Sequence, residues 1–184
     1  PARMNDQRAA PPPSLGSVPA AGPPLAEPPP YPYPSRPQMS EIMRGNRKRD
    51  TRPEVDLRSA LHRAGLRFRK DFAVRPDEGR VIRVDVAFPR ARVAVFVDGC
   101  FWHRCPKHGN DPRSNSSYWG PKLARNVERD REVNTRLAAA GWRVVRIWEH
   151  SVGEPSAKMR TTAQIAELVQ NQEGADGGTH HGLH

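Results

Sequence analysis

The stretch from Arg92 to His108, which reads RVAVFVDGCFWHRCPKH, constrains the fold of this chain more than any other. Its first part, Val93 to Val97, is a continuous apolar run rich in β-branched residues, which is typical of a strand buried on both faces. Two thiols, two large aromatic rings and two imidazoles follow directly after Asp98-Gly99. A buried strand that delivers such a cluster to its carboxyl end predicts a functional site at the edge of a mixed sheet.

The hydrophobic periodicity around this strand predicts an α/β fold. The expected elements follow the order helix, three strands, helix and strand, at residues 51–64, 67–72, 81–88, 93–97, 121–140 and 142–148. Short links among the first three strands favour an antiparallel meander, and the long helical crossover favours a last strand parallel to an earlier one. A loop at residues 151–156 and a weaker helical stripe at residues 158–169 complete the pattern.

Composition divides the chain into three parts. Residues 1–38 contain 13 of the 20 prolines and few large aliphatic side chains, so we expect a disordered extension there. Residues 39–170 form the expected folded domain, and the Gly- and His-rich residues 171–184 form an expected disordered tail. The formal net charge of +10 predicts a polyanionic partner, with nucleic acid ahead of an anionic membrane surface.

The same sequence argues against a membrane protein, because no apolar run approaches the roughly 20 residues that a membrane span needs. Its two cysteines lie together in the central stretch, beside histidines. This arrangement favours a metal site in a reducing cytosol over a disulfide. We therefore expect a cytoplasmic, nucleoid-associated monomer.

Three carboxylates are candidate functional groups, and each has a plain structural alternative. Asp85 lies in mid-strand, where Asp is disfavoured, and needs a cation or hydrogen-bond donors if that face is covered. Otherwise it lies on a solvated face. Glu54 ends a capping-box sequence and would cap its own helix, and Asp130 would be a surface charge at the edge of a helical stripe. The apolar residues expected on the opposite face of the strand from Asp85 are Ile82, Val84, Val86 and Phe88.

The thiols and imidazoles predict a metal site. Cys100, Cys105 and His108 have the spacing C-x4-C-x2-H, and His150 follows the next predicted strand. Four nitrogen and sulfur ligands suit a tetrahedral structural Zn²⁺ site, which would join the loop after the central strand to the end of the last strand. The alternative is two buried free thiols and two ordinary histidines.

The blocks TRPE, DGCFWHRCPKH and KLARNVERDREVNTRLAAAGWRVVRIWEH together resemble the very-short-patch-repair (Vsr) endonucleases. The resemblance covers nearly all of the expected folded part. It implies a restriction-endonuclease-like core with an αβββαβ mixed sheet and a structural zinc site. It also implies that double-stranded DNA is nicked on the 5′ side of the T in a T:G mismatch left by deamination of 5-methylcytosine. Such a function would place mismatch-repair proteins and a cytosine-5 methyltransferase system among the partners.

The resemblance also implies roles for individual residues. Asp85 would bind a catalytic Mg²⁺ with the backbone carbonyl of Val97, and Glu54 would hold metal-bound water. His103 would be the catalytic imidazole, with Asp130 as its partner. The remaining assignments are Cys100, Cys105, His108 and His150 for structural Zn²⁺, and Phe101, Trp102, Trp119 and Met43 for intercalation beside the mismatch.

Two departures from the family pattern leave alternatives open. Asp98 stands where better-known members have a His, so a second acid there could bind the metal directly. Among the zinc positions, Cys105 stands where a His is familiar, and His108 and His150 stand where Cys are familiar, which still gives a chemically sound Cys2His2 set. The alternatives to T:G nicking are a Vsr-like nuclease of broader mismatch or restriction-associated specificity, and a non-catalytic, zinc-stapled DNA-binding protein.

Overall fold

The structure is a computed structural model, and it describes residues 49–109 and 115–177. Its helices are α2 (Arg52–Arg63), α3 (Ser116–Ala139), α4 (His150–Gly153) and α5 (Pro155–Gly177), and its strands are β1 (Arg69–Val74), β2 (Ile82–Phe88), β3 (Val93–Asp98) and β4 (Arg143–Trp148). The expected extension at residues 1–38, Met43 and the end of the expected tail lie outside these ranges.

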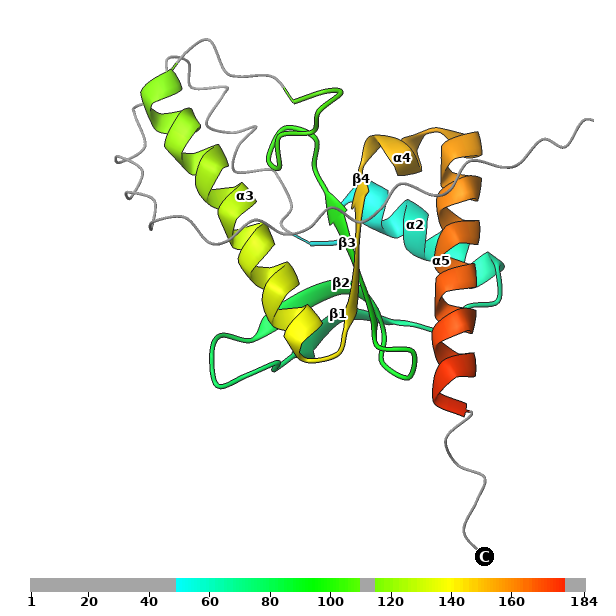
Figure 1. The fold of residues 1–184 in the computed structure, drawn as a ribbon. Coiled ribbons are helices and arrows are strands. Elements are labelled where there is room, and N and C mark those ends of the chain that lie inside the picture. The colour runs from blue at the N-terminus through cyan, green and yellow to red at the C-terminus, as the bar shows by residue number, and fades with distance from the viewer. Residues whose placement is uncertain (1–48, 110–114, 178–184) are drawn as a thin grey trace, which may run out of the picture.

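The strands form one mixed sheet in the order β1-β2-β3-β4. The pairs β1–β2 and β2–β3 are antiparallel, whereas β4 returns parallel to β3 after the long helix α3. Figure 1 shows α3 on one side of the sheet and α2, α4 and α5 on the other. The predicted αβββαβ order and the direction of the last strand are therefore confirmed. Within the described residues, no helix is long and apolar enough to span a membrane.

Each face of the sheet has its own apolar core. On the α2/α5 side, Val93 and Val95 of β3 pack with residues such as Leu57 and Ile165. On the α3 side, Ala94 and Phe96 of the same strand pack in the group that contains Leu137. The central strand is thus buried on both faces, as its continuous apolar run predicted.

The strand β2 differs from the prediction, because its side chains change faces at Asp85. Ile82 and Val84 pack in the core on the α3 side, whereas Val86 and Phe88 pack in the core on the α2/α5 side. The register with β1 runs from Val74↔Ile82 to Arg69↔Ala87 without a pair at Asp85. The expectation that the four apolar residues share one face was wrong, because a local break in a ladder moves later side chains to the other face.

Helix limits also differ from the predictions. Helix α3 begins at Ser116, so Pro121 lies inside the helix instead of at its start. The expected loop at residues 151–156 contains α4 and the start of α5, where the Glu154 carboxylate accepts hydrogen bonds from the backbone N–H groups of Ser156 and Ala157. An acidic cap followed by Pro at the first position begins this helix. Helix α5 ends at Gly177, beyond residue 170, where the domain was expected to end.

Candidate active site and metal centre

Asp85 lies at the break in β2, beside the end of β3. Its Oδ2 accepts a hydrogen bond of 2.9 Å from the backbone N–H of Val97. Burial, with smaller contributions from the nearby charges of Glu54 and Asp98, raises the pKa of Asp85 to about 6 against the lowering effect of the Val97 N–H. A half-buried carboxylate of this kind is stabilised in its charged form by a bound cation.

Glu54 approaches Asp85 from the first turn of α2. Its carboxylate is buried and accepts hydrogen bonds of 2.9 Å from the Asp50 backbone N–H and from the Thr51 hydroxyl. Glu54 therefore orders the start of its own helix, as the structural alternative proposed. It also lines the same pocket as Asp85, together with charged side chains that include Arg58. The structure thus brings two of the predicted site carboxylates to one pocket.

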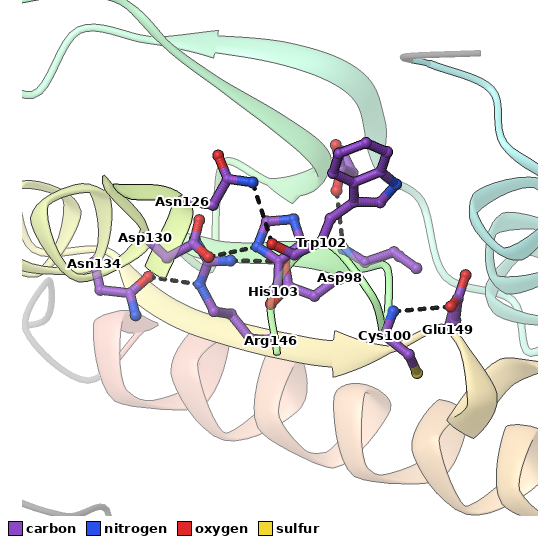
Figure 2. Close-up of polar contacts among 11 residues, drawn as sticks. Asp98, Cys100, Trp102, His103, Asn126, Asp130, Asn134, Arg146 and Glu149 are labelled. Atoms are coloured by element: carbon purple, nitrogen blue, oxygen red, sulfur yellow. Dashed lines mark hydrogen bonds and ion pairs between the residues drawn. The ribbon is translucent and has the colours of Figure 1, made fainter. Parts of the chain in front are cut away.

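A second group, which we call the acid–imidazole cluster, consists of Asp98, His103, Asp130 and Arg146 (Figure 2). His103 Nδ1 lies 2.5 Å from Asp130 Oδ2. Because an ionised carboxylate can only accept, this contact fixes the proton on Nδ1 and leaves Nε2 as the basic nitrogen. Arg146 bonds both carboxylates, through Asp98 Oδ1 at 2.7 Å and Asp130 Oδ1 at 3.1 Å. The predicted pairing of His103 with Asp130 is thus present in the structure.

Sequence analysis did not identify Arg146, which lies in the middle of β4. A signal for it was present on α3, where Asn126, Asp130 and Asn134 follow one another at intervals of four residues and so share one helix face. Asn126 donates to the Trp102 carbonyl, and the Asn134 side-chain oxygen accepts from Arg146 Nε. This polar face of α3 is what holds the acid–imidazole cluster against the sheet.

The other group, the Cys/His cluster, consists of Cys100, Cys105, His108 and His150. Its four ligand atoms all lie within 4.8 Å of one another. The Nδ1 atoms of the two histidines are 3.2 Å apart, and the sulfur-to-nitrogen distances run from 3.1 to 3.9 Å. Tetrahedral Zn²⁺ with its usual bond lengths gives ligand-to-ligand distances of roughly 3.3–3.8 Å, so the donor set and its spacing fit that ion.

The protonation chemistry of the Cys/His cluster agrees with a metal site. Both cysteines are buried and free. Burial raises the pKa of the Cys100 thiol to about 11. Burial and the neighbouring His108 lower the pKa of His150 and favour the neutral imidazole that binds metals. A bound cation would deprotonate the thiols outright. Glu149 supports the loop by accepting a hydrogen bond of 2.8 Å from the Cys100 backbone N–H.

The predicted intercalating residues form an aromatic cluster beside the imidazole. Ring centroids lie 5.1 Å apart for Phe101 and Trp102, and 5.4 Å apart for Phe101 and Trp119. Phe101 and Trp102 are partly exposed, whereas Trp119 is 9 % exposed. The Lys122 ammonium lies 5.7 Å from the Trp102 ring centroid and 5.3 Å from that of Trp119. The structure brings these three rings together, and Met43 lies outside the described residues.

Comparisons with known proteins identify the family of this chain. The sequence model of the family described as DNA mismatch endonuclease Vsr matches residues 35–108. The chain is 54% identical over 120 residues to the type II nicking enzyme V.NaeI of Lentzea aerocolonigenes, a match that covers 65% of this chain and 72% of that protein. It is 40% identical over 121 residues to the type II nicking enzyme V.XorIIP of Xanthomonas oryzae pv. oryzae, covering 63% and 82%. It is 38% identical over 111 residues to the DNA mismatch endonuclease Vsr of Escherichia coli, covering 60% and 68%. The chain therefore belongs to the Vsr family of DNA mismatch endonucleases.

Proposed function

We propose that this protein is a DNA endonuclease that nicks one strand on the 5′ side of the T in T:G mismatches produced by deamination of 5-methylcytosine. Family membership supports the nuclease activity. The observation that carries the proposal is the short contact between His103 Nδ1 and Asp130, in a chain whose other carboxylates, Asp85 and Glu54, line one pocket. An oriented imidazole near metal-binding carboxylates is what hydrolysis of a phosphodiester requires.

Asp85 and the carbonyl of Val97 would hold Mg²⁺, because hard oxygen donors suit this ion and a cation would stabilise the charged form of a carboxylate whose pKa burial raises. When bound, Mg²⁺ would relieve negative charge at the phosphate. His103 accepts a proton from the attacking water at Nε2, while Asp130 holds the Nδ1 proton and the ring orientation. Glu54 places water in the pocket next to Asp85.

The Cys/His cluster would bind Zn²⁺ in a structural role. Its four donors leave no open position for a substrate, which is the pattern of structural zinc sites. The ion would join the loop after β3 to the start of α4. This join would fix Phe101, Trp102 and His103, which lie between the two cysteines in the sequence.

DNA recognition would divide between charge and stacking. After Pro37 the chain has 27 Lys and Arg residues against 18 Asp and Glu residues, and such an excess binds phosphates with little regard to sequence. Insertion of Phe101, Trp102 and Trp119 costs a few kcal/mol per unstacked step and less at a mispair, so it favours mismatched sites. Met43 would enter from the opposite groove.

A second candidate function is nicking of mismatches within the target sequence of a restriction–modification system. The similarity to proteins named type II nicking enzymes favours it. In this case the partner system would contain a cytosine-5 methyltransferase, whose product creates the mismatch by deamination. The chemistry at Asp85 and His103 would be the same, and the flanking bases would differ.

The test is incubation of a strand-labelled T:G duplex with the full chain in Mg²⁺ or in EDTA, with the matched T:A duplex as control. We expect a single Mg²⁺-dependent nick on the 5′ side of the mispaired T. A panel of flanking sequences separates the two candidates, because the second requires one restriction target. A duplex that is retarded in a gel but never cut, also after excess Mg²⁺ is restored, would instead indicate a non-catalytic DNA-binding protein.

A further inference from the structure

Arg146 is buried to an extent that its charge alone would not favour. Its side chain is 20% exposed, its guanidinium carbon lies 4.9 Å from the centroid of the Phe96 ring, and its Nε donates to Asn134 Oδ1 at 3.0 Å. Moving a guanidinium out of water is unfavourable unless its N–H groups are paired. All three of its nitrogens have a partner in the acid–imidazole cluster or on α3, so the cation is held in one orientation.

The two ends of the guanidinium reach two carboxylates from different elements. Nη1 bonds Asp98 Oδ1 at the end of β3, and Nη2 bonds Asp130 Oδ1 on α3. Both carboxylates are themselves largely buried, with side chains 7% and 16% exposed. A rigid fork that joins two acids fixes the distance between them, which a flexible ammonium would not do.

These contacts are asymmetric with respect to His103. Its Nδ1 lies 2.5 Å from Asp130 Oδ2 and 3.7 Å from Asp98 Oδ1. The Asp98 oxygen nearest to the imidazole is the same atom that accepts from Arg146. On Asp130, by contrast, Arg146 takes Oδ1 and leaves Oδ2 to the imidazole. The His103 Nδ1–H therefore faces two acceptors, Asp130 Oδ2 and Asp98 Oδ1, and the Arg146 guanidinium occupies Asp98 Oδ1.

We propose that Arg146 is a positioning residue that selects Asp130 over Asp98 as the partner of His103. By occupying Asp98 Oδ1, it keeps the imidazole in the orientation that presents Nε2 to water, and it keeps that oxygen from serving as a metal ligand. The catalytic part of this proposal rests on the proposed role of His103 as proton acceptor. The choice between the two carboxylates stands independently of it.

The kinetic test compares single-turnover nicking rates of T:G duplex at saturating enzyme for the full chain and its variants. Arg146→Met should lower the rate about 10- to 100-fold, the range for removing an outer-shell partner that orients a metal-bound histidine, with the dissociation constant for DNA changed less than about threefold. Arg146→Lys should be intermediate, since it restores one ion pair. Arg143→Met is the matched control, because it removes the same charge from the exposed far end of β4. Its single-turnover nicking rate at saturating enzyme should be unchanged.

The decisive variant is Arg146→Met/Asp98→Asn. If Asp98 competes for the imidazole once Arg146 is gone, removing its charge should recover at least about fivefold of the rate relative to Arg146→Met. A double variant that is no faster than Arg146→Met, or an Arg146→Met variant as fast as the starting protein, would overturn the proposal. An Asp98→Asn single variant with a sharply altered Mg²⁺ requirement would also overturn it, since Asp98 would then be a metal ligand.

A second measurement separates this proposal from the proposed function. Proton and nitrogen-15 NMR of the imidazoles reports the strength of the His103 Nδ1–H hydrogen bond through the chemical shift of that proton, and it needs no nuclease activity. Because both acids face Nδ1, we expect the Nδ1–H form in every variant, with the strongest Nδ1 hydrogen bond in the starting protein and in Asp98→Asn and a weaker one in Arg146→Lys. An Nδ1 hydrogen bond unchanged in Arg146→Lys and Arg146→Met would refute the positioning role, whether or not the protein nicks DNA. Failure of the starting protein to nick any duplex would refute the function alone.

Discussion

Two groups built around histidines lie at the carboxyl ends of β3 and β4, and they balance charge in opposite ways. In the Cys/His cluster, His108 and His150 turn Nδ1 atoms toward each other at 3.2 Å, with two buried thiols beside them. Four donors that converge on one point need a cation between them. In the acid–imidazole cluster, the His103 Nδ1–H donates a hydrogen bond to Asp130, and Arg146 supplies the positive charge. In our proposal the same side chain is therefore a metal ligand in one group and a base in the other.

The comparison teaches that the charge of the surrounding side chains decides the role of a histidine. Close spacing to other potential metal ligands does not decide it alone. Both groups bring three or more His, Cys or acidic side chains within 4.8 Å of one another. The close polar contacts described within the first group join its own thiols and imidazoles, whereas the second group contains Arg146, whose fork satisfies both acids. Arg146 already pairs with Asp98 and Asp130, so we expect loss of metal to affect the Cys/His cluster more than the acid–imidazole cluster.

The largest expected effect is that of Asp85→Ala, which tests whether the Asp85 pocket is the site that needs Mg²⁺. We expect nicking to fall by more than about 10⁴-fold, beyond the range of general acid–base catalysis alone, because charge relief at the phosphate is lost. DNA binding should persist or tighten, since a negative charge near phosphate is removed. Gel retardation and a nicking assay measure the two effects. Near-normal nicking would move the Mg²⁺ site to Asp98.

His103→Ala should lower the nicking rate by roughly 10²–10⁴, the span of general acid–base catalysis. The concentration of Mg²⁺ needed for half-maximal rate should change little, because His103 is proposed to act on water. Single-turnover rates across a Mg²⁺ titration measure both quantities. A shifted Mg²⁺ requirement with a nearly unchanged maximal rate would make His103 a metal ligand and remove the contrast between the two groups.

Cys105→Ser should break the Cys/His cluster and leave the other group's chemistry in place. We expect loss of bound zinc and a fall in melting temperature of about 10 °C or more, because metal binding contributes directly to folding. Metal analysis and thermal unfolding of the pure protein test this expectation. Metal-free protein whose melting temperature does not respond to chelators would contradict the assignment.

Asp85→Asn should stabilise the protein without added Mg²⁺ at pH 7. The folded-state pKa of Asp85 is raised from 3.8 to about 6, so the native state binds the proton more tightly and its stability falls as pH rises from about 4 to about 6. The amide avoids this loss, with an expected gain of about 1–3 kcal/mol above pH 6. Denaturant unfolding at pH 4 and pH 7 should show the gain at pH 7. Equal stability of the two proteins at pH 7 would mean that Asp85 is better solvated than its pKa implies.

Trp102→Ala should have the smallest effect of these substitutions, and the effect should differ between mismatched and matched DNA. We expect the preference for T:G over T:A duplex to fall about tenfold, while affinity for the matched duplex changes little, because stacking and phosphate contacts are separate contributions. Competition binding at fixed salt measures the ratio. Equal losses on both duplexes would assign Trp102 to general affinity instead of mismatch selection.

The sequence predicted the fold well because hydrophobic periodicity and chain connectivity leave few arrangements for one buried strand, a meander and a helical crossover. It predicted the Cys/His cluster for a different reason, since Cys and His in a short stretch have few structural uses. Arg146 escaped prediction because its role depends on the register of β4 with β3 and on the face that α3 presents, which a linear pattern does not contain. Pro121 misplaced the start of α3, because Pro favours but does not require the first turn.

The change of faces in β2 makes the length of this strand as consequential as its composition. On either side of Asp85, apolar residues are assigned to different cores. Deleting a residue beside this break, such as Ala87, would turn Phe88 to the wrong side of the sheet, because successive side chains point to opposite faces, whereas replacing Asp85 by another small residue would not. The strand should therefore tolerate inactivating substitutions far better than indels, and dead variants for trapping bound DNA should be made by exchange at this position, never by shortening the strand.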